Sequence, residues 1–522
     1  MNRRLAAGLF GLGAIVVALV AVSAAFATST SGPTFPSKDP FYSYSGSLKN
    51  VKPGTVLKKR SVTIVDDASG APEPGVTGEQ VLYRTTTERD KPTITVATVI
   101  RPLVPNPNEA KIVSYQTAYD ALGPICDPSY TLQGGNRTYS TAADEEQFLV
   151  QYAREEGYTV VVPDYESVHL DWGAGQESGY GTLDGIRATE QWLNLAQKST
   201  PVAMVGYSGG SIATEFASEV QPKYAPSLHV VGSASGGIPA YFAHNLAYIN
   251  GSSSWSGVIP AVLIGVSRAF NLNSAKYESA FGRKVAKQVS NECINNFLGS
   301  YPGLTIEKLL KRPYKDFFTV ARFAKINNRL IMSRTGTPKE PLFMGVGNAD
   351  GTGDSVMVAA DDEALAHTYC KRGVPVQFNQ YTGSQFTHSD AAVPFETGAF
   401  AFINQVLNGG TPSNGCSSVT QGNSLAPLPT HRTNVEFRSV GRNRHGPGVV
   451  VKLRARHRRV GRLVLQVRHL ESPVQTTSIK RLTTAWHRVV IKVAAKTPAR
   501  GYYTITATRG QRMVLYRMLL LH

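Results

Sequence analysis

Short apolar runs alternate with helix-like segments over most of this chain. Runs of this kind are typical of strands buried on both faces, and the segments between them repeat their apolar positions with helical spacing. We predict strands at 62–65, 80–86, 93–100, 111–115, 158–163, 202–205, 229–231, 341–347 and 374–381. We predict helices at 145–156, 182–197, 211–219, 360–371 and 394–408. The alternation implies an α/β fold with a mostly parallel sheet covered on both faces.

Two stretches depart from this alternation. The Gly-rich stretch at 173–181 has no clear helical pattern, so we expect a long surface loop there. Later in the chain, helical spacing occurs in four consecutive segments, at 241–249, 258–270, 276–291 and 306–310. We interpret the region from about 233 to 340 as a helical cap inserted above the strand ends. An ordinary layer of peripheral helices is the alternative interpretation.

The C-terminal part of the chain has a different pattern. Residues 413–429 are rich in Ser, Gly, Asn and Pro, as expected of a linker. Beyond them, alternating apolar and polar segments are separated by polar turns, which is typical of a small β-sandwich. We therefore predict an α/β domain at 28–416, a linker at 417–430 and a β-rich module at 431–522.

The first 27 residues have the pattern of an export signal. Arg3 and Arg4 precede an uncharged apolar run at 5–25, and a small-x-small cleavage site ends at Ala27. The run is long enough to span a bilayer, so an uncleaved anchor is the alternative. The cleavage site and the polar residues that follow it favour removal. We expect a secreted, extracellular protein.

The net charge of +17 is distributed unevenly. Residues 431–522 carry 20 Lys and Arg against Glu436 and Glu471, a net charge of +18, so the first 430 residues have a net charge of −1. A basic module is suited to hold the protein on acidic cell-wall polymers or on an anionic lipid surface. A spacer for stability or secretion is the alternative. We expect no nucleic-acid partner, because the module lacks interleaved aromatic residues and the chain is exported.

The stretch at 202–213 carries the clearest catalytic motif. An apolar strand runs into Gly206-Tyr-Ser-Gly-Gly210, and a helical segment follows. This is a G-x-S-x-G elbow in the strand–turn–helix context that it requires. Glycines flank the serine because Cβ atoms would clash in so sharp a turn. We predict Ser208 as a nucleophile and the amide of Gly209, at a helix N-terminus, as a donor to a developing oxyanion.

A base and an acid should follow this serine, because elbows of this type occur in the chain order serine, acid, histidine. His388 lies in the loop after the last predicted strand, where the base is expected. The acid should follow the strand at 341–347. Asp350 is nearest to the end of that strand, whereas Asp354 begins an acid-x-apolar-apolar sequence. These patterns leave both aspartates open.

No metal or cofactor is expected. The four cysteines, at positions 126, 293, 370 and 416, include no close C-x-x-C pair, so structural disulfides are favoured over a zinc site. Three disulfide connectivities are open in principle. The glycines and acids at 348–354 lack the acidic spacing and the closing Glu of an EF-hand calcium loop.

Several short segments between about 42 and 416 form a more specific pattern than the elbow alone. They are Ser114-Tyr-Gln-Thr, Tyr119-Asp120, Cys126-x-Pro-Ser, Pro163-Asp-Tyr-Glu, Gly206-Tyr-Ser-Gly-Gly-Ser, Tyr369-Cys-x-x-Gly, and Asn408-Gly-Gly-Thr-Pro with Cys416. Together they resemble the secretory lipase family, which is typified by fungal lipase A and has many actinobacterial members. The resemblance implies an α/β-hydrolase fold with a mobile cap. The C-terminal module lies outside it.

The resemblance also implies a catalytic triad. Its members are Ser208, an aspartate in the 350–354 loop, and His388. Counting back from Cys370, as the family pattern does, favours Asp354 over Asp350. We therefore predict Asp354 as the acid, which holds the histidine tautomer and stabilises the imidazolium.

Further implications of the resemblance concern the oxyanion hole and the disulfides. Asp120 and the Gly209 amide form the oxyanion hole, and the disulfides are Cys126–Cys293 and Cys370–Cys416. The loop at 116–130 lacks the His-Gly-Gly-Gly sequence of common esterases. Asp120 would have to be protonated, or act through its backbone, to donate a hydrogen bond.

Three hypotheses for function follow. The leading one is a secreted serine esterase or lipase that hydrolyses carboxylic, acylglycerol-like esters through an acyl-enzyme on Ser208. An exported peptidase or acyltransferase with the same triad is the second, because a fold does not fix a substrate. The third is an inactive hydrolase-like protein that binds a surface through its basic module.

Overall fold

The computed structural model describes residues 32–136, 141–314, 316–430, 434–442, 448–469, 475–492, 501–509 and 512–521. The predicted export signal lies outside these ranges. Within them, no helix is both long enough and apolar enough to cross a lipid bilayer.

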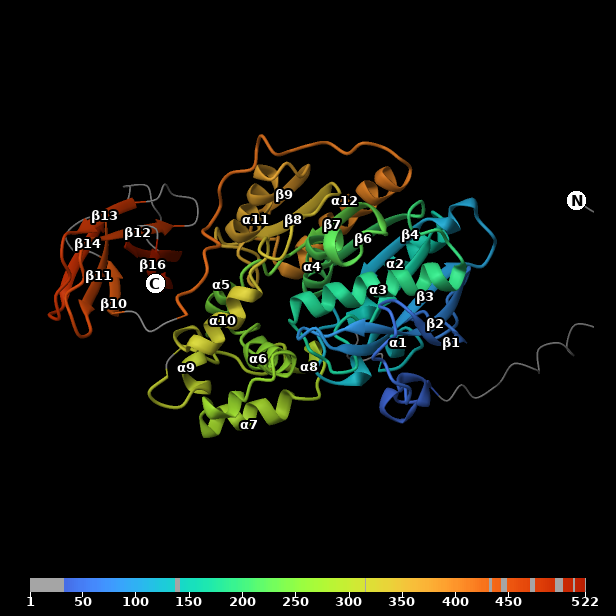
Figure 1. Ribbon diagram of the computed structural model, residues 1–522, viewed down its shortest axis with the longest axis horizontal. Coiled ribbons are helices and arrows are strands. Elements are labelled where there is room, and N and C mark those ends of the chain that lie inside the picture. The colour runs from blue at the N-terminus through green and yellow to red at the C-terminus, as the bar shows by residue number, and fades with distance from the viewer. Residues whose placement is uncertain are drawn as a thin grey trace, which may run out of the picture.

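A nine-stranded mixed sheet forms the centre of the molecule (Figure 1). Its strands are β1 (Val56–Val62), β2 (Val76–Thr86), β3 (Pro92–Pro102), β4 (Ile112–Gln116), β5 (Thr159–Pro163), β6 (Pro201–Tyr207), β7 (His229–Gly236), β8 (Leu342–Asn348) and β9 (Val376–Thr382). The spatial order is β1-β2-β3-β5-β4-β6-β7-β8-β9. Pairing is antiparallel from β1 to β5 and parallel from β5 to β9. The predicted α/β fold with a mostly parallel sheet is confirmed.

Helices cover both faces of this sheet, because successive residues of a strand point to opposite sides. One face carries α3 (Gly175–Leu193), α4 (Gly209–Tyr224) and α11 (Ala359–Lys371), and the other carries α2 (Thr141–Arg154) and α12 (His388–Leu407). On β4, Ile112 is buried with residues of α3 and α4, whereas Val113 is buried with residues of α2 and α12. Short helical segments in the connections are α1 (Pro128–Thr131), η1 (Pro36–Lys38), η2 (Pro40–Tyr42), η3 (Pro107–Ala110) and η4 (Pro124–Cys126).

A helical region is inserted between β7 and β8. Its elements are α5 (Phe242–Tyr248), α6 (Val258–Ala269), η5 (Ser274–Lys276), α7 (Ala280–Val289), α8 (Ile294–Phe297), α9 (Ile306–Leu309), η6 (Phe317–Thr319) and α10 (Ala321–Arg329). Phe242, Val262 and Phe323 of this region share a buried apolar cluster with Met344 and Val346 of β8. The inserted helices, which we call the cap, therefore pack on the same core as the sheet (Figure 1).

The Gly-rich stretch at 173–181 is not the surface loop that its composition suggests. Most of it forms the first turns of α3, and Gly175 and Gly179 are buried. A Cβ atom on Gly175 would lie 2.3 Å from the ring of Phe216, and one on Gly179 would lie 2.7 Å from the backbone nitrogen of Ala217. Glycine lowers helix propensity, but here it allows α3 and α4 to approach closely. The loop prediction was wrong for this reason.

The C-terminal strands form two antiparallel sheets. The first consists of β10 (Val435–Arg442), β11 (Gly448–Ala455) and β14 (His487–Lys492), and the second of β13 (Gln475–Ile479), β12 (Leu463–His469), β15 (Gly501–Arg509) and β16 (Arg512–Leu521). Val451 and Leu453 of one sheet share a buried core with Leu465 and Val467 of the other. This is the small all-β module that the alternating pattern predicts.

The segment at 417–430, which we interpreted as a linker, packs against the α/β body. Asn423 Nδ2 donates a 2.8 Å hydrogen bond to Asp361 Oδ1, and Leu428 is buried. Asn328 Nδ2 of α10 also donates to the carbonyl of Leu428, at 2.8 Å. The polar composition that predicts a linker is compatible with a chain bound along the surface.

Candidate active site

The elbow between β6 and α4 contains one residue with a strained backbone, Ser208. Ser208 has φ 54° and ψ −122°, a combination that is rare for a residue other than glycine. The glycines on either side permit the turn. A Cβ atom on Gly206 would lie 2.6 Å from the carbonyl of Gly210, and one on Gly210 would lie 1.9 Å from Gln116 O. The turn leaves Ser208 Oγ within hydrogen-bonding distance of His388.

Ser208, His388 and Asp354 form a continuous hydrogen-bonded chain. His388 Nε2 lies 2.7 Å from Ser208 Oγ, and His388 Nδ1 lies 2.7 Å from Asp354 Oδ2. Asp354 Oδ1 accepts hydrogen bonds from the amides of Val356 at 2.9 Å and Met357 at 2.6 Å. This arrangement suits a serine that is activated by an imidazole, itself oriented by a carboxylate.

His388 reaches this position from the start of a helix. The sequence pattern places it in the loop after β9 and begins the last helix at 394. In the structure His388 is the first residue of α12, and Pro394 lies inside that helix. Proline lacks the N–H that a helix interior uses, so the sequence pattern begins the helix at Pro394, whereas in the structure the helix continues through this residue. As a result, His388 is held at a helix end and its side chain is almost wholly buried.

Asp350, the other candidate acid, makes a different set of contacts. Its Oδ1 accepts hydrogen bonds from the amides of Thr352 at 2.8 Å and Gly353 at 3.0 Å. Its Oδ2 accepts one from the hydroxyl of Tyr248, on cap helix α5, at 2.8 Å. The same hydroxyl accepts a 3.1 Å hydrogen bond from the amide of Ser355. Asp350 thus shapes the loop that carries Asp354 and ties it to the cap.

Asp120 lies directly beside the elbow. It follows β4, has a φ of 41°, and its side chain is buried. A Cβ atom on Gly209 would lie 1.6 Å from Asp120 Oδ1, so the two residues are in close contact. The structure therefore brings both predicted oxyanion residues to the same side of Ser208.

Few interactions offset the free-energy cost of burying the carboxyl of Asp120. Burial raises the pKa of Asp120 from 3.8 to about 7, and the charge of His388 and the indole of Trp172 oppose this rise only in part. Asp120 Oδ1 has no hydrogen-bond partner among the described residues. A carboxyl with this pKa is largely neutral below pH 7 and can then donate a hydrogen bond.

The loop that carries Asp120 is attached to the cap. The amide of Leu122 donates a 3.1 Å hydrogen bond to Glu292 O, and the disulfide Cys126–Cys293 joins the same two segments, with 5.6 Å between the Cα atoms. A second disulfide, Cys370–Cys416, joins the end of α11 to the segment after α12. The structure thus contains both disulfides that the resemblance implies. The first of them ties the loop that carries Asp120 to α8.

A small apolar cavity of about 50 Å³ lies over Ser208. Its lining includes Asp120 and Trp172 from the body and Phe242, Leu246, Trp255 and Val262 from the cap. A second cavity of about 40 Å³, almost free of polar lining, shares Phe242, Leu246 and Val262 with the first. It continues between α6, α10 and η6 to Phe317 and Phe323. The two cavities follow one apolar path from the serine into the cap.

Sequence patterns did not single out several residues of this site. Trp255 stands edge-on to the His388 ring, with 5.3 Å between the ring centroids. The hydroxyl of Tyr207 donates a 2.7 Å hydrogen bond to the backbone carbonyl of His388. Tyr207 could have been suspected as the variable residue of the elbow motif. Trp172, Tyr248 and Trp255 carry no local signal, because tertiary packing brings them to the site.

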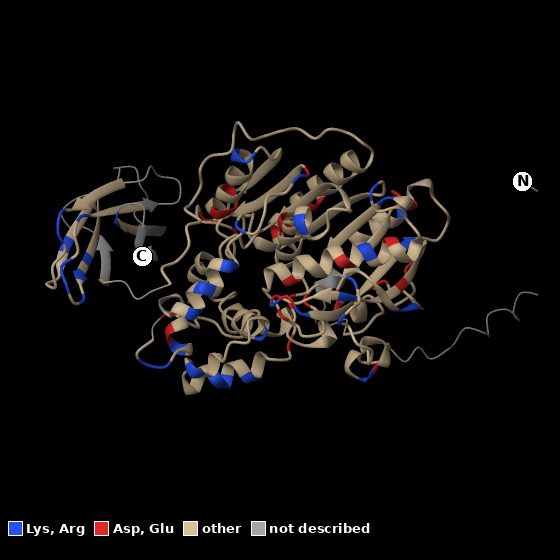
Figure 2. Ribbon diagram, viewed as in Figure 1, with Lys and Arg blue, Asp and Glu red and all other residues tan. Residues whose placement is uncertain are grey.

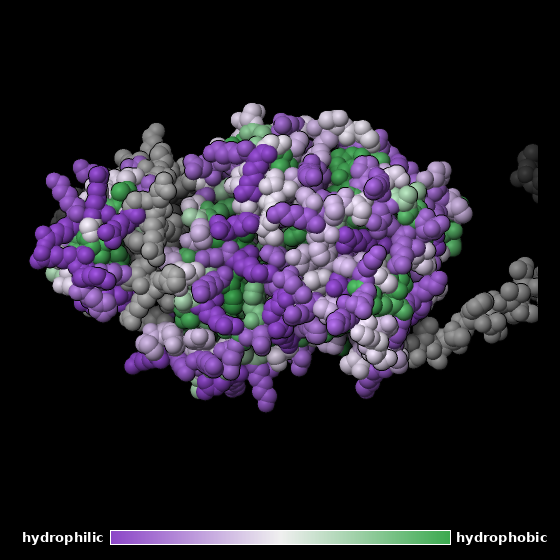
Figure 3. Space-filling model, in the orientation of Figure 1, coloured by the Kyte–Doolittle hydropathy of each residue, from purple (hydrophilic) through white to green (hydrophobic). Residues whose placement is uncertain are grey.

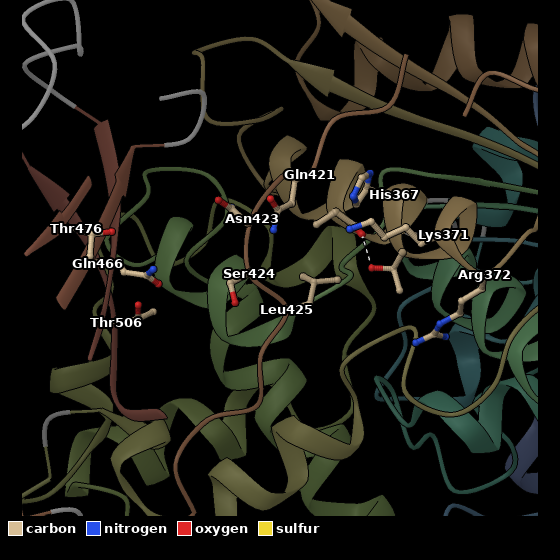
Figure 4. A pocket seen from close by; sticks show the side chains of 12 residues that line it. His367, Lys371, Arg372, Gln421, Asn423, Ser424, Leu425, Gln466, Thr476 and Thr506 are labelled. Atoms are coloured by element: carbon tan, nitrogen blue, oxygen red, sulfur yellow. Dashed lines mark hydrogen bonds between the residues drawn. The ribbon is translucent and has the colours of Figure 1, made fainter. Parts of the chain in front are cut away.

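Another cavity, of about 770 Å³, does not have Ser208 in its lining (Figure 4). It is bounded by α11, by the segment at 421–425 and by strands of the C-terminal module. Its polar lining includes His367, Lys371, Gln466 and Thr476, and none of the triad residues. Among the residues that the structure describes, no group of three or more His, Cys, Asp or Glu side chains is placed to hold a metal ion.

Comparisons with known proteins agree with this geometry. The model of the secretory lipase family matches residues 132–415. The chain belongs to the secretory lipase family. It is 30% identical to lipase A of Arthroderma benhamiae, over 74% of this chain and 83% of that protein. It is also 30% identical to a secreted triacylglycerol lipase of Malassezia furfur, over 73% of this chain and 78% of that protein.

Two further similarities bear on fold and activity. The crystal structure of Candida antarctica lipase A superposes with a TM-score of 0.67 at 28% identity, covering 74% of this chain and 89% of that one. A Mycobacterium tuberculosis protein described as a probable inactive lipase is 29% identical over 67% of this chain and 77% of its own length.

The family model, the two fungal lipases and the lipase A structure together classify this chain. This secretory lipase is an α/β-hydrolase, an extracellular protein and a carboxylic ester hydrolase of the lipase type.

Proposed function

We propose that this protein hydrolyses acylglycerol-like esters through an acyl-enzyme on Ser208. The observation that supports this most directly is the unbroken chain from Ser208 Oγ through His388 to Asp354, with 2.7 Å at each link. His388 Nε2 takes the proton of Ser208 Oγ as the oxygen attacks the ester carbonyl. The protonated imidazole then gives that proton to the leaving alcohol, and a water molecule activated by His388 releases the acid.

The oxyanion of each tetrahedral intermediate would form beside Gly209 and Asp120. The Gly209 amide lies at the start of α4, where free N–H groups and the helix dipole favour negative charge. The neutral form of Asp120 supplies a second donor from its carboxyl. This arrangement replaces the glycine-rich donor loop of common esterases, which the chain lacks.

The apolar path under the cap supports a fatty acyl group as the substrate moiety. Its two cavities of about 50 and 40 Å³ are lined mainly by aliphatic and aromatic side chains. Small-molecule sites usually hold roughly 300 to 1,000 Å³. The cap therefore has to move before a long acyl chain can enter, and the loop around Trp255 covers the histidine until it does.

The test is hydrolysis of p-nitrophenyl esters of increasing chain length by the wild type and by Ser208→Ala. The variant should lose at least ~10³-fold in kcat, because the nucleophile is absent. Fluorophosphonate labelling should modify Ser208 in the wild type. Full activity in Ser208→Ala would contradict the proposal, and an unlabelled, inactive wild type would place this chain with the inactive relative.

The same triad could transfer the acyl group to other acceptors or cleave amides. Turnover of aminoacyl anilides at rates comparable to esters would indicate a peptidase. A preference for alcohols over water as acceptor would indicate an acyltransferase. The lining of the path is mainly apolar and, among the residues that the structure describes, Asp120 is its one charged group, which favours esters over peptides.

We also propose that the C-terminal module, at 431–522, holds the enzyme on anionic cell-surface polymers or lipids, including those of the cell wall. Exposed cations on its described strands and turns, among them Lys452, Arg458, Arg459 and Arg462, support this. Truncation after Thr430 keeps the segment that packs on the body and should leave ester hydrolysis intact. Retention on anionic surfaces at low salt should fall. Loss of activity without loss of retention would contradict the domain division proposed here.

A further inference from the structure

The hydrolase region is electrostatically divided in two. Residues 237–341, which form the cap, carry 14 Lys and Arg against five Asp and Glu, a net charge of +9. The rest of the first 430 residues carries 20 Lys and Arg against 30 Asp and Glu, a net charge of −10. The near-neutral total for this part of the chain conceals a basic cap on an acidic body.

The charges of the cap differ in exposure as well as in number. Of the 13 lysines and arginines that the structure describes in the cap, 12 are exposed, and Glu307 is the single exposed acid among the five. Glu278 and Glu340 are buried, and Glu292 and Asp316 are partly buried. The outer surface of the cap therefore presents an almost purely cationic field. Figure 2 shows these cations along α7, α9 and α10.

The cations gather because α7 and the end of α9 lie side by side. The amide of Ser279 donates to Leu309 O at 2.8 Å, and the amide of Lys311 donates to Tyr277 O at 2.9 Å. Gly282 permits this contact, since a Cβ atom there would lie 2.2 Å from Leu309 O. We call the surface formed by Lys284, Lys287, Lys308 and Lys311 the basic cap face. In Figure 3 the edge of the molecule where α7 lies is mostly hydrophilic.

Helix α7 is amphipathic in the sense expected at a lipid interface. Val285 and Val289 are buried against the cap, while Lys284 and Lys287 point outward. Phe281, on the same helix, is 47% exposed. Cations with an exposed aromatic ring suit the boundary between head groups and acyl chains, where the ring enters and the cations meet anionic groups. A soluble polyanion would use the cations but not the ring.

The position of α7 relates this surface to the active site. Helix α7 packs on α6, and α6 supplies Val262 and Val266 to the apolar path that leads to Ser208. A lipid surface that binds the basic cap face thus lies against the helices that have to move before an acyl chain enters. Each hydrolysed ester would also leave a fatty acid carboxylate in that surface, which adds negative charge as the reaction proceeds.

We infer that the basic cap face is a docking surface for an anionic lipid interface and orients the cap toward it. The inference rests on the proposed lipid-ester function and is distinct from retention by the C-terminal module. Near an anionic membrane, each Lys or Arg contributes roughly 1 kcal/mol to binding, so a few cations are enough for reversible attachment. Salt should weaken the attachment, because the charges are exposed.

The test uses the full chain and vesicles of ether-linked lipids, which contain no carboxylic ester bond for the enzyme to cleave. Co-sedimentation is measured with phosphatidylcholine vesicles and with vesicles that contain phosphatidylglycerol. We expect binding to the anionic vesicles only. The loss is measured in the full chain and in the chain that ends at Thr430, because the C-terminal module is itself proposed to bind anionic lipids. In the shorter chain the variant Lys284→Glu, Lys287→Glu, Lys311→Glu should bind these vesicles at least ~10-fold more weakly than the unsubstituted shorter chain does. The variant's hydrolysis of a short, water-soluble ester should be unchanged, which also shows that it is folded.

A matched control reverses three exposed lysines of the body, as Lys49→Glu, Lys59→Glu, Lys198→Glu. It changes the net charge equally and should retain vesicle binding within about threefold, since long-range charge is screened in salt. Equal losses in both variants, or no binding by the wild type, would overturn the inference. So would a cap variant that loses binding to soluble polyphosphate but not to vesicles. Because the lipids are not cleaved, failure here is separable from failure of the ester hydrolase proposal.

Discussion

Two loops at the same edge of the sheet each bring a buried aspartate to the candidate active site, and the hydrogen bonding around the two aspartates differs. The loop after β8 surrounds Asp354 with donors: two backbone amides and the imidazole of His388. The loop after β4 leaves Asp120 Oδ1 without a hydrogen-bond partner among the described residues, and burial raises the pKa of its carboxyl to about 7. The carboxylate of Asp354 accepts hydrogen bonds in the structure, whereas we predict that the carboxyl of Asp120 donates one to the oxyanion.

The difference lies in how the two loops are held. The Asp354 loop turns back on itself, so its own amides reach the carboxylate. The Asp120 loop extends toward the cap, where Leu122 and Cys126 attach it to the segment at 292–293. No amide of its own returns to Asp120 Oδ1. The backbone around each aspartate therefore sets its surroundings, and with them the different roles that we predict for Asp354 and Asp120.

The largest effect is expected from Asp354→Asn. An amide in place of the carboxylate favours the wrong imidazole tautomer and cannot stabilise the imidazolium, so kcat should fall by about 10⁴-fold. Steady-state hydrolysis of p-nitrophenyl butyrate measures this. Asp390→Asn, on the exposed side of the same histidine helix, is the control and should leave kcat unchanged. A loss of less than tenfold in Asp354→Asn would show that Asp354 is not the triad acid.

A smaller loss is expected when the side chain of Asp120 is removed. Asp120→Gly tolerates the φ of 41° and deletes the donor, so kcat should fall by roughly 10²- to 10³-fold. Asp120→Asn keeps a neutral donor and should retain most activity near pH 6. A kcat that is equally low in Asn and Gly variants would contradict a hydrogen-bond donor role. An unchanged kcat in both would assign the role to the backbone.

The pH dependence of kcat and of stability provides a second test of Asp120. Because the pKa of Asp120 is about 7, its neutral form is lost as the pH rises through 7, so wild-type kcat should decline on the alkaline side relative to Asp120→Asn. Ionisation of Asp120 should also lower the stability of the fold as the pH rises. The folded pKa lies above the unfolded value of 3.8, so ionisation costs folding free energy that grows as pH rises from about 4 to about 7. The gain in Tm from Asp120→Asn should therefore be larger at pH 8 than at pH 5.

Elements and residues whose positions follow from local sequence patterns could be predicted from the sequence. Residues that tertiary packing brings together could not. Buried strands are apolar throughout, so the parallel part of the sheet is visible as runs. The edge strand β1 is not, because the charged residues Lys58, Lys59 and Arg60 interrupt its apolar pattern, and its predicted position at 62–65 was wrong. The site shows the same division. The elbow around Ser208 is local and its geometry was expected, whereas Trp255 reaches His388 from a cap loop without any pattern.

The choice between Asp350 and Asp354 could be predicted only in part from the sequence. Both lie in one loop, so spacing alone could not separate them, and the family pattern favoured the second. The structure places Asp354 against His388 and gives Asp350 to Tyr248 and two backbone amides. Their catalytic roles stay predictions until the variants are measured.

Asp350→Asn tests whether the contacts of Asp350 are needed to hold Asp354 in position beside His388. Asparagine keeps an acceptor but weakens the charge-assisted hydrogen bonds to the loop amides and to Tyr248. We expect about a 10-fold fall in kcat with little change in KM, because Asp354 shifts while the apolar path does not. A fall as large as that of Asp354→Asn would mean that Asp350 takes part in the relay directly. Asp67→Asn, in the loop after β1, is a matched control for the charge change.

The smallest effect is expected from Tyr248→Phe, which removes one hydroxyl between the cap and the acid loop. The hydroxyl donates to Asp350 and accepts from Ser355, so its loss should lower the free energy of unfolding by about 1 to 2 kcal/mol. The loop keeps its own amide contacts to both aspartates, so kcat should change by less than about threefold. Urea unfolding and ester hydrolysis measure the two effects, with Tyr44→Phe as an exposed control. A large loss of kcat at unchanged stability would show that the cap, rather than the loop's own backbone, holds Asp354 in place.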